Sequence, residues 1–173
     1  MHVASTERTP VSSPESRTES ELDPPIDPDI PPPGARRRPE GALLLVIGIA
    51  GAVGALARYG LALLITSPPT GFPWSTFAIN VSGSLVIGFV LVLLAERFPH
   101  AHLARPLVVT GFLGAYTTFS TYAVDTDSLV RHSAIAMAVA YAAASLLVGA
   151  LATFGGVVLA RALLRLEDRL DVR

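Results

Sequence analysis

The chain has 173 residues, of which 51% are hydrophobic and 16% are charged, and its formal net charge is −1. It contains no cysteine, which excludes disulfides, metal–thiolate sites and thiol nucleophiles. The charged residues concentrate outside long apolar runs, so a membrane rather than water is the expected solvent for most of the chain.

The first forty residues differ in composition from the rest. Nine of the fourteen prolines lie there, among scattered serine, threonine, aspartate and glutamate residues. Such a segment cannot bury enough apolar surface to offset the entropy lost on ordering, so we predict a disordered tail over residues 1–40. A cleaved signal peptide is not expected, because no basic start followed by an apolar core precedes Arg36.

Apolar runs in the remainder predict four membrane-spanning helices, each of roughly the 20 residues that a helix needs to cross the hydrocarbon core. The runs cover residues 42–66, 75–95, 106–124 and 133–160. Because short loops join them, residues 41–162 are predicted to form one all-α membrane domain. A cytoplasmic C-terminal tail is predicted over residues 163–173.

The first span combines small residues with one arginine. Small residues recur three and four positions apart, which favours close packing of helix backbones; they are Gly48, Gly51, Ala52, Gly54 and Ala55. Arg58 interrupts the span, and an arginine inside a bilayer helix costs about 2.5–3.5 kcal/mol on insertion scales. It therefore either snorkels to the membrane surface or faces a water-filled vestibule, where it would concentrate anions.

Polar side chains form narrow stripes on the second and fourth spans. Thr76, Asn80 and Ser84 follow one another at successive turns of the second span, and Tyr141 and Ser145 lie four apart on the fourth. Asn80 either bonds a neighbouring helix or uses its amide donors to replace water around an anion. A serine in a membrane helix usually bonds its own backbone, but stripes on several helices together suggest a shared hydroxyl-lined track.

The third span has no charge but is rich in glycine and hydroxyl residues. Gly111 and Gly114 loosen the helix, and the threonines that follow can bond backbone groups left open by a break. Free carbonyls at a break would make hard oxygen ligands for a small cation. Phe119 and Tyr122 lie on one face, where they either pack as ordinary aromatic residues or present their positive ring edges to an anion.

Arginine, in the absence of lysine, predicts the orientation. With four spans both termini lie on one side of the membrane, and Arg131 is the only arginine in the loop on the other side. The first side holds Arg36, Arg37, Arg38, Arg97, Arg105, Arg161, Arg165, Arg169 and Arg173. The positive-inside bias therefore places both termini in the cytoplasm, with the chain as a multi-pass protein of the cell membrane.

Three segments of the first three spans, residues 51–59, 76–83 and 114–121, together resemble one family, the Fluc (CrcB-type) fluoride channels. The likeness covers about residues 42–162. It implies a fluoride-selective channel that works as an antiparallel, dual-topology-type dimer with two pores, through which fluoride leaves the cell passively. It also implies a structural sodium ion at the dimer centre, held by main-chain oxygens of Gly114 and Thr117.

The resemblance also assigns residues to the fluoride pathway. They are the pore asparagine Asn80, the first aromatic Phe119, the fourth-helix Tyr141 and Ser145, and the vestibule arginine Arg58. Thr76 is added to the predicted pathway because it lies on the same polar stripe as Asn80. Tyr122 stands where the family commonly has a second phenylalanine, which keeps a ring edge and adds a hydroxyl.

The arginine bias bears on assembly. A homodimer of inverted subunits requires one chain to insert both ways, which normally goes with balanced arginines. We therefore expect this chain to insert in one orientation and to pair with a related, oppositely oriented subunit. A homodimer is the alternative.

Two other classes of protein have a similar size. A four-helix multidrug exporter needs a membrane carboxylate, and none is expected within the spans, since Asp125 and Asp127 are placed at the end of the third span and in the loop that follows. A purely structural membrane subunit would explain the packing glycines but not the hydroxyl stripes. An enzyme is not expected, because no span holds a nucleophile, a base and a metal set, and neither is a nucleic-acid partner.

Overall fold

The computed structural model describes residues 40–101 and 103–171, and these residues form helices and no strand. Four helical segments are long and apolar enough to cross a membrane: Gly41–Leu64, Trp74–Glu96, Arg105–Arg131 and Ile135–Leu170. The predicted all-α membrane domain with four spans is therefore confirmed. The tail predicted over residues 1–40 lies outside the described residues, apart from Glu40 at the start of the first helix.

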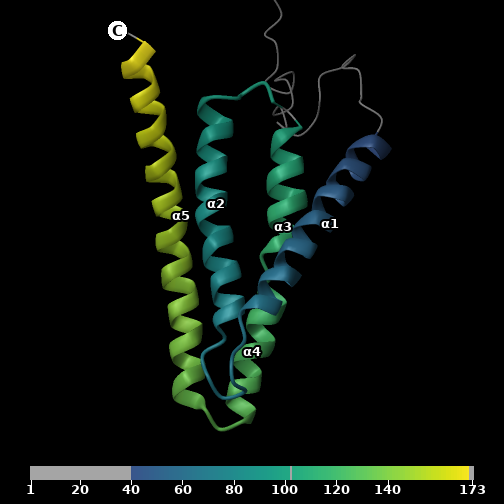
Figure 1. Cartoon of the computed structure of the whole chain (residues 1–173), viewed down its shortest axis with the longest axis vertical. Helices are drawn as coiled ribbons and strands as arrows, with labels where there is room; N and C mark the ends of the chain where they lie inside the picture. The colour runs from purple at the N-terminus through teal and green to yellow at the C-terminus, as the bar shows by residue number, and fades with distance from the viewer. Residues whose placement is uncertain (1–39, 102, 172–173) are drawn as a thin grey trace, which may run out of the picture. The chain divides into compact units, whose positions relative to one another are not determined.

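Short connections join the helices (Figure 1). The elements are α1 (Glu40–Leu64), α2 (Trp74–Glu96), the π-helix η2 (Arg105–Leu113), α3 (Gly114–Tyr116), α4 (Phe119–Arg131) and α5 (Ile135–Asp171). The helix α5 has 37 residues, so it is about 55 Å long, well beyond a hydrocarbon core of about 30 Å. Most of the segment predicted as a C-terminal tail is thus a continuation of this helix.

Glycines let α2 and α5 pack closely as neighbours (Figure 1). A β-carbon added to Gly88 of α2 would collide with the carbonyl oxygen of Thr153 on α5, and one added to Gly156 of α5 would collide with the carbonyl oxygen of Leu85 on α2. Lipid offers no hydrophobic drive for helix association, so such close backbone approach supplies the packing energy. The two glycines thereby hold α5 against α2.

The first half of the third span packs against α1, again through glycine. A β-carbon on Gly54 would collide with the carbonyl oxygen of Phe112, and one on Gly111 would lie 2.7 Å from the β-carbon of Ala50. Gly51 also faces this crossing, since a β-carbon added to it would lie 3.7 Å from the carbonyl oxygen of Gly111. The packing role predicted for the small residues of the first span is confirmed for Gly51 and Gly54, whereas a β-carbon added to Gly48 would meet nothing within 4 Å.

The third span is broken, as predicted. Thr117 (φ −74°, ψ 156°) and Thr118 (φ −148°, ψ 120°) are extended, so the helix stops after α3 and restarts as α4. Thr118 caps the new helix, because its side-chain oxygen accepts a hydrogen bond from the backbone N–H of Thr121 at 3.2 Å. The hydroxyl residues after Gly114 therefore bond the backbone at the break.

The prediction that the third span ends at residue 124 is wrong. The new helix α4 continues to Arg131, so both Asp125 and Asp127 lie inside it, and neither is in a loop. The helix ends later than predicted because the cap at Thr118 starts a new helix, which continues beyond the apolar run. Asp125 and Asp127 therefore lie on the helix that carries the third span, so the expected lack of a carboxylate no longer separates this chain from a proton-coupled exporter.

A tight turn joins α4 to α5. The N–H of Ala134 bonds the carbonyl of Leu129 at 2.9 Å, and the N–H of Ser133 bonds that of Val130 at 3.0 Å. This pair of bonds is the Schellman arrangement, in which the residue after the cap adopts a left-handed conformation. Ser133 does so, with φ 59°, although glycine would occupy that conformation without steric cost.

Candidate functional site

Asn80 of α2 lies beside the break in the third span and bonds its backbone twice. Its Nδ2 donates to the carbonyl oxygen of Thr118 at 2.9 Å, and its Oδ1 accepts from the N–H of Thr118 at 2.8 Å. Thr118 is buried, and a buried backbone group without a partner costs about 1–3 kcal/mol. One side chain thus satisfies both backbone groups of a residue that has left the helix.

The same bonds free two carbonyl oxygens. In an uninterrupted helix the N–H of Thr118 would bond the carbonyl of Gly114, and the N–H of Thr121 would bond that of Thr117. Instead, Thr118 N–H bonds Asn80, and Thr121 N–H bonds the side chain of Thr118. The carbonyls of Gly114 and Thr117 therefore lose their helical donors, and these are the two residues predicted to offer main-chain oxygens to a cation.

A groove of about 270 Å³ opens next to the break. It brings together five residues that the sequence predicts for ion binding, contributed by α2, the third span and α5. These residues are Asn80, Thr117, Phe119, Tyr122 and Ser145, and Ser84, Ile87, Thr118 and Leu146 complete the lining. An amide carries two N–H groups, so Asn80 keeps one donor besides the one that bonds Thr118.

Ser145 contributes the hydroxyl whose surroundings are the most unusual. Within residues 40–101 and 103–171 it is the only buried side-chain polar group without a hydrogen-bond partner. Thr153 on the same helix bonds the carbonyl of Gly149 at 3.1 Å, the usual behaviour of such a residue in a membrane helix. An unpaired buried hydroxyl costs about 1–3 kcal/mol, and a ligand that bonds it would remove this cost. The hydroxyl of Ser145 is therefore the group of the groove best suited to bond a small polar ligand.

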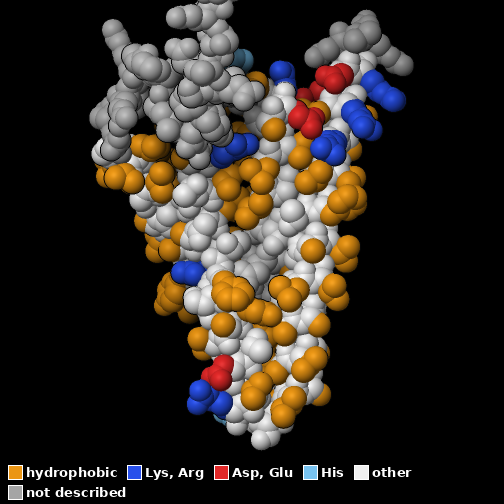
Figure 2. All heavy atoms as spheres, turned by 180° about the vertical axis from the view of Figure 1, so that it is seen from behind, with side chains coloured by type: hydrophobic (Ala, Val, Ile, Leu, Met, Phe, Trp, Pro, Cys, Tyr) orange, Lys and Arg blue, Asp and Glu red, His pale blue; other side chains and the backbone are white. Residues whose placement is uncertain are grey.

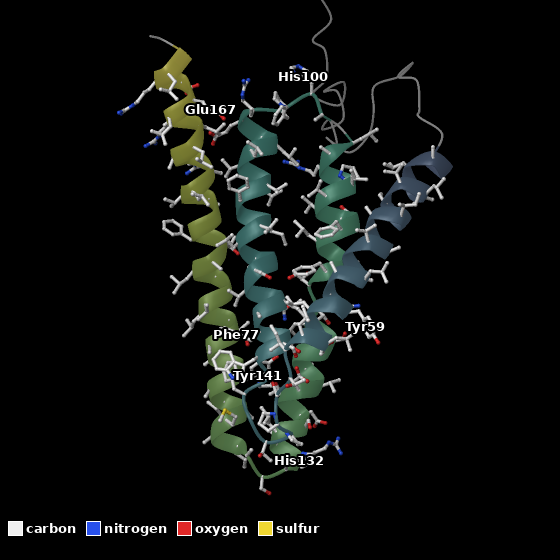
Figure 3. All side chains as sticks on the ribbon, in the orientation of Figure 1. Tyr59, Phe77, His100, His132, Tyr141 and Glu167 are labelled. Atoms are coloured by element: carbon white, nitrogen blue, oxygen red, sulfur yellow. The ribbon has the colours of Figure 1, made fainter. Side chains whose placement is uncertain are left out.

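Aromatic rings continue from the groove toward the α4–α5 turn. Phe119 is 77% exposed, and its ring centroid lies 5.5 Å from that of Tyr122. Tyr122 in turn lies 5.4 Å from Tyr141, which is fully buried and meets Phe72 edge to face. Figure 3 shows Tyr141 of α5 close to Phe77 of α2, and both belong to the apolar cluster that holds α4 against α5.

Asp125 is a site residue that the sequence analysis missed. Its Oδ2 accepts a hydrogen bond of 2.7 Å from the hydroxyl of Thr76 and a long one of 3.5 Å from the hydroxyl of Tyr141. Two residues predicted for the pathway, one on α2 and one on α5, are thus linked by a carboxyl group on α4. A helix started at the Thr118 cap would have placed Asp125 one turn after Tyr122, on the same face.

Arg58 is the one predicted residue that stands apart. It lies on α1, which contributes nothing to the lining of the groove, and its side chain is partly buried. Thr76 and Tyr141 also lie outside the lining, but Tyr141 contacts the groove residue Tyr122 and bonds Asp125 together with Thr76. Of the nine predicted residues, five line the groove and Gly114 lies at the break. Thr76 and Tyr141 connect to the groove through Asp125 and Tyr122, and Arg58 is not among the lining residues.

Comparison with known proteins assigns the chain to a family. The model described as "CrcB-like protein, Camphor Resistance (CrcB)" matches residues 45–157. The chain belongs to the CrcB family. The match covers every residue predicted for the site, from Arg58 to Ser145, so the resemblance seen in the sequence is confirmed.

Several curated proteins are similar to this CrcB chain. Fluoride-specific ion channel FluC 3 of Streptomyces avermitilis is 39% identical over 138 residues, which cover 80% of this chain and 68% of the relative. FluC 2 of the same organism is 44% identical over 65% of this chain and 73% of the relative. FluC of Chlorobaculum tepidum is 41% identical over 68% of this chain and 94% of the relative.

The family and the helices together define the class of protein. A CrcB chain with four membrane-spanning helices is a multi-pass membrane protein. The names of its relatives are those of ion channels, which are not a class of enzyme.

Proposed function

We propose that this chain is a subunit of a fluoride-specific ion channel, which lets fluoride leave the cell passively and so lowers its toxicity. The groove beside the break is the observation that carries the proposal. In it, the amide of Asn80, the unpaired hydroxyl of Ser145 and the exposed ring of Phe119 meet from three parts of the chain. The names of the CrcB relatives agree with this function.

The chemistry of the groove suits a small, strongly hydrated anion. Such an ion moves only if other donors replace its water without holding it too firmly. The spare N–H of Asn80 and the hydroxyl of Ser145 are neutral donors, and the ring edges of Phe119 and Tyr122 carry partial positive charge. The carboxyl oxygen of Asp125 would repel an anion, but it lies outside the groove lining and already accepts bonds from two hydroxyls.

A structural sodium ion fits the two freed carbonyls. Unwound backbone in membrane helices binds sodium through carbonyl oxygens, and the carbonyls of Gly114 and Thr117 both lack their helical donors. Gly114 is also exposed on the surface of the described domain. In this proposal the ion joins two subunits through these oxygens and is not transported.

A second subunit in inverted orientation completes the proposal. Gly114, Ser120 and Thr121 are exposed beside the break, yet broken backbone at membrane depth is tolerated only where protein or a polar cavity surrounds it. A partner that covers this face would bury it and close the groove into a pore. The arginine bias favours a related chain inserted the other way as this partner, and a homodimer is the alternative.

The orientation has a direct test. A peptide tag at the C-terminus should be accessible only from the cytoplasm if the chain inserts one way, with both termini inside. An even split of the tag between the two sides would show dual insertion and would favour the homodimer.

Fluoride efflux from liposomes tests the function. Vesicles that contain the purified protein, alone and with its related partner, should release fluoride and retain chloride. Phe119→Leu should slow the release about tenfold, since a ring-edge contact contributes about 1.5 kcal/mol. Phe154→Leu is the matched control, because Phe154 is similarly exposed (67%) but lies outside the groove. Vesicles that stay sealed to fluoride, or that instead exchange protons for a cationic drug as an exporter would, contradict the proposal.

A further inference from the structure

A second cavity lies far along α2 from the groove, where the helix ends and η2 begins. Its volume is about 430 Å³, and its walls include Leu94, Phe98, Arg105 and Pro106. Among the residues that the structure describes, Arg105 is the only charged one in this lining, and the remaining ones are two alanines and a proline. None of these residues touches the groove or was predicted for ion transport.

This cavity lies between the end of one membrane span and the start of the next, where the surface of the membrane is expected. The apolar run of α2 stops at Glu96, and the next span starts at Arg105. Phe98, between them, is 51% exposed, and aromatic and basic side chains are typical of the layer where hydrocarbon meets the lipid headgroups. Figure 2 shows several basic side chains at the same end of the domain, where α5 terminates.

We propose that this cavity binds one anionic phospholipid, with its phosphate on Arg105 and its first acyl carbons against Leu94 and Phe98. A guanidinium matches a phosphate in charge and in the spacing of its donors, and basic pockets between membrane helices bind acidic headgroups. The apolar walls select a lipid over a free phosphate ion, because a free ion would leave Leu94 and Phe98 uncovered.

A neighbouring cavity also contains an arginine but is less suited to bind an anionic lipid. It shares Phe98 and holds Arg97, but Glu167 lines it as well. A carboxylate beside the arginine offsets its charge and would repel a phosphate. Of these two cavities, the Arg105 cavity combines a basic group, apolar walls and no carboxylate among its described lining residues.

Native mass spectrometry of the purified full-length chain tests this proposal with phosphatidylglycerol as the probe. Arg105→Gln should weaken phosphatidylglycerol binding about fivefold, the contribution expected of one arginine at a charged lipid surface. Arg105→Lys should retain most of the binding, and the Gln variant should lose less affinity for phosphatidylcholine, whose choline cation offsets the charge of its phosphate, than for phosphatidylglycerol. The control is Arg131→Gln at the α4–α5 turn, where Arg131 pairs with Asp127.

Three outcomes would overturn the proposal. They are unchanged phosphatidylglycerol binding by Arg105→Gln, an equal loss in Arg131→Gln, and displacement of the lipid by inorganic phosphate at the same concentration. Phe98→Ala gives a second test that leaves the charge in place. It should also weaken binding, and full retention of phosphatidylglycerol by this variant would exclude the apolar contact.

Discussion

Replacing Asn80 should destabilise the break in the third span, and the structure allows the loss to be calculated. Asn80→Ala removes both partners of Thr118, its N–H and its carbonyl, and leaves them buried. At about 1–3 kcal/mol for each unpaired group, the free energy of unfolding should fall by about 2–6 kcal/mol. Asn80→Asp keeps the acceptor for the N–H but places an oxygen against the carbonyl of Thr118, so at least half of that loss is expected.

Unfolding in detergent measures these losses through one intrinsic probe. The chain has a single tryptophan, and Trp74 starts α2 with its ring 4.5 Å from that of Phe72, so its fluorescence reports the unfolding of this helix. Ser82→Ala is the control on the same helix, because it removes an exposed bond to Tyr116 and should cost about 0.5–1 kcal/mol.

The comparison among the Asn80 variants decides the outcome. If Asn80→Ala unfolds at the same denaturant concentration as the original chain, the bonds to Thr118 do not hold the break. If Asn80→Asp is as stable as the original chain, the bond from the amide of Asn80 to the carbonyl of Thr118 does not contribute to stability.

Three further experiments test the packing and the hydrogen bonds of the described domain. Gly54→Ala should lower stability by about 1–3 kcal/mol through overpacking against the third span, whereas Gly48→Ala on the same helix, with nothing within 4 Å, should be neutral or slightly stabilising; equal effects would contradict the crossing. Asp125→Ala and Thr76→Val should each cost about 1–2 kcal/mol and be non-additive in the double variant, because each removes the bond that the two residues share. Ser133→Gly should raise the unfolding temperature by relieving a left-handed residue that costs about 1 kcal/mol; a lower unfolding temperature would show that the serine side chain is needed there.

Most of the fold follows from the apolar runs, but the length of the third span does not. Hydropathy marks where lipid can contact a helix, so the starts of α2 and α5 fall within two residues of the predicted positions. The helix α4 extends past Val124 because its N-terminus is capped by Thr118 and its end by the turn at Ser133. Such capping hydrogen bonds depend on backbone geometry, so a hydropathy pattern does not predict them.

The sequence predicted which residues belong to the site better than it predicted their hydrogen bonds. The spacing of Asn80 and Ser145 placed polar atoms on helices that could meet, and both line one groove. The sequence could not reveal that Asn80 bonds Thr118, which is 38 residues away, since any polar group near the break would have fitted the pattern. Nor could it distinguish Ser145, which lacks a partner, from Thr153, which bonds its own helix.

The two hydrogen bonds between Asn80 and the backbone of Thr118 explain why an asparagine occupies position 80. Pairing the N–H and the carbonyl of one residue requires a donor and an acceptor side by side, and a second N–H is needed to face the groove. Aspartate has no donor when ionised, and serine offers a single oxygen to both backbone groups. Because Asn80 takes the N–H of Thr118, the carbonyl of Gly114 loses its helical donor. The proposed cation site and the proposed anion path therefore depend on the same amide, and a variant that releases Thr118 should weaken sodium binding as well as fluoride passage.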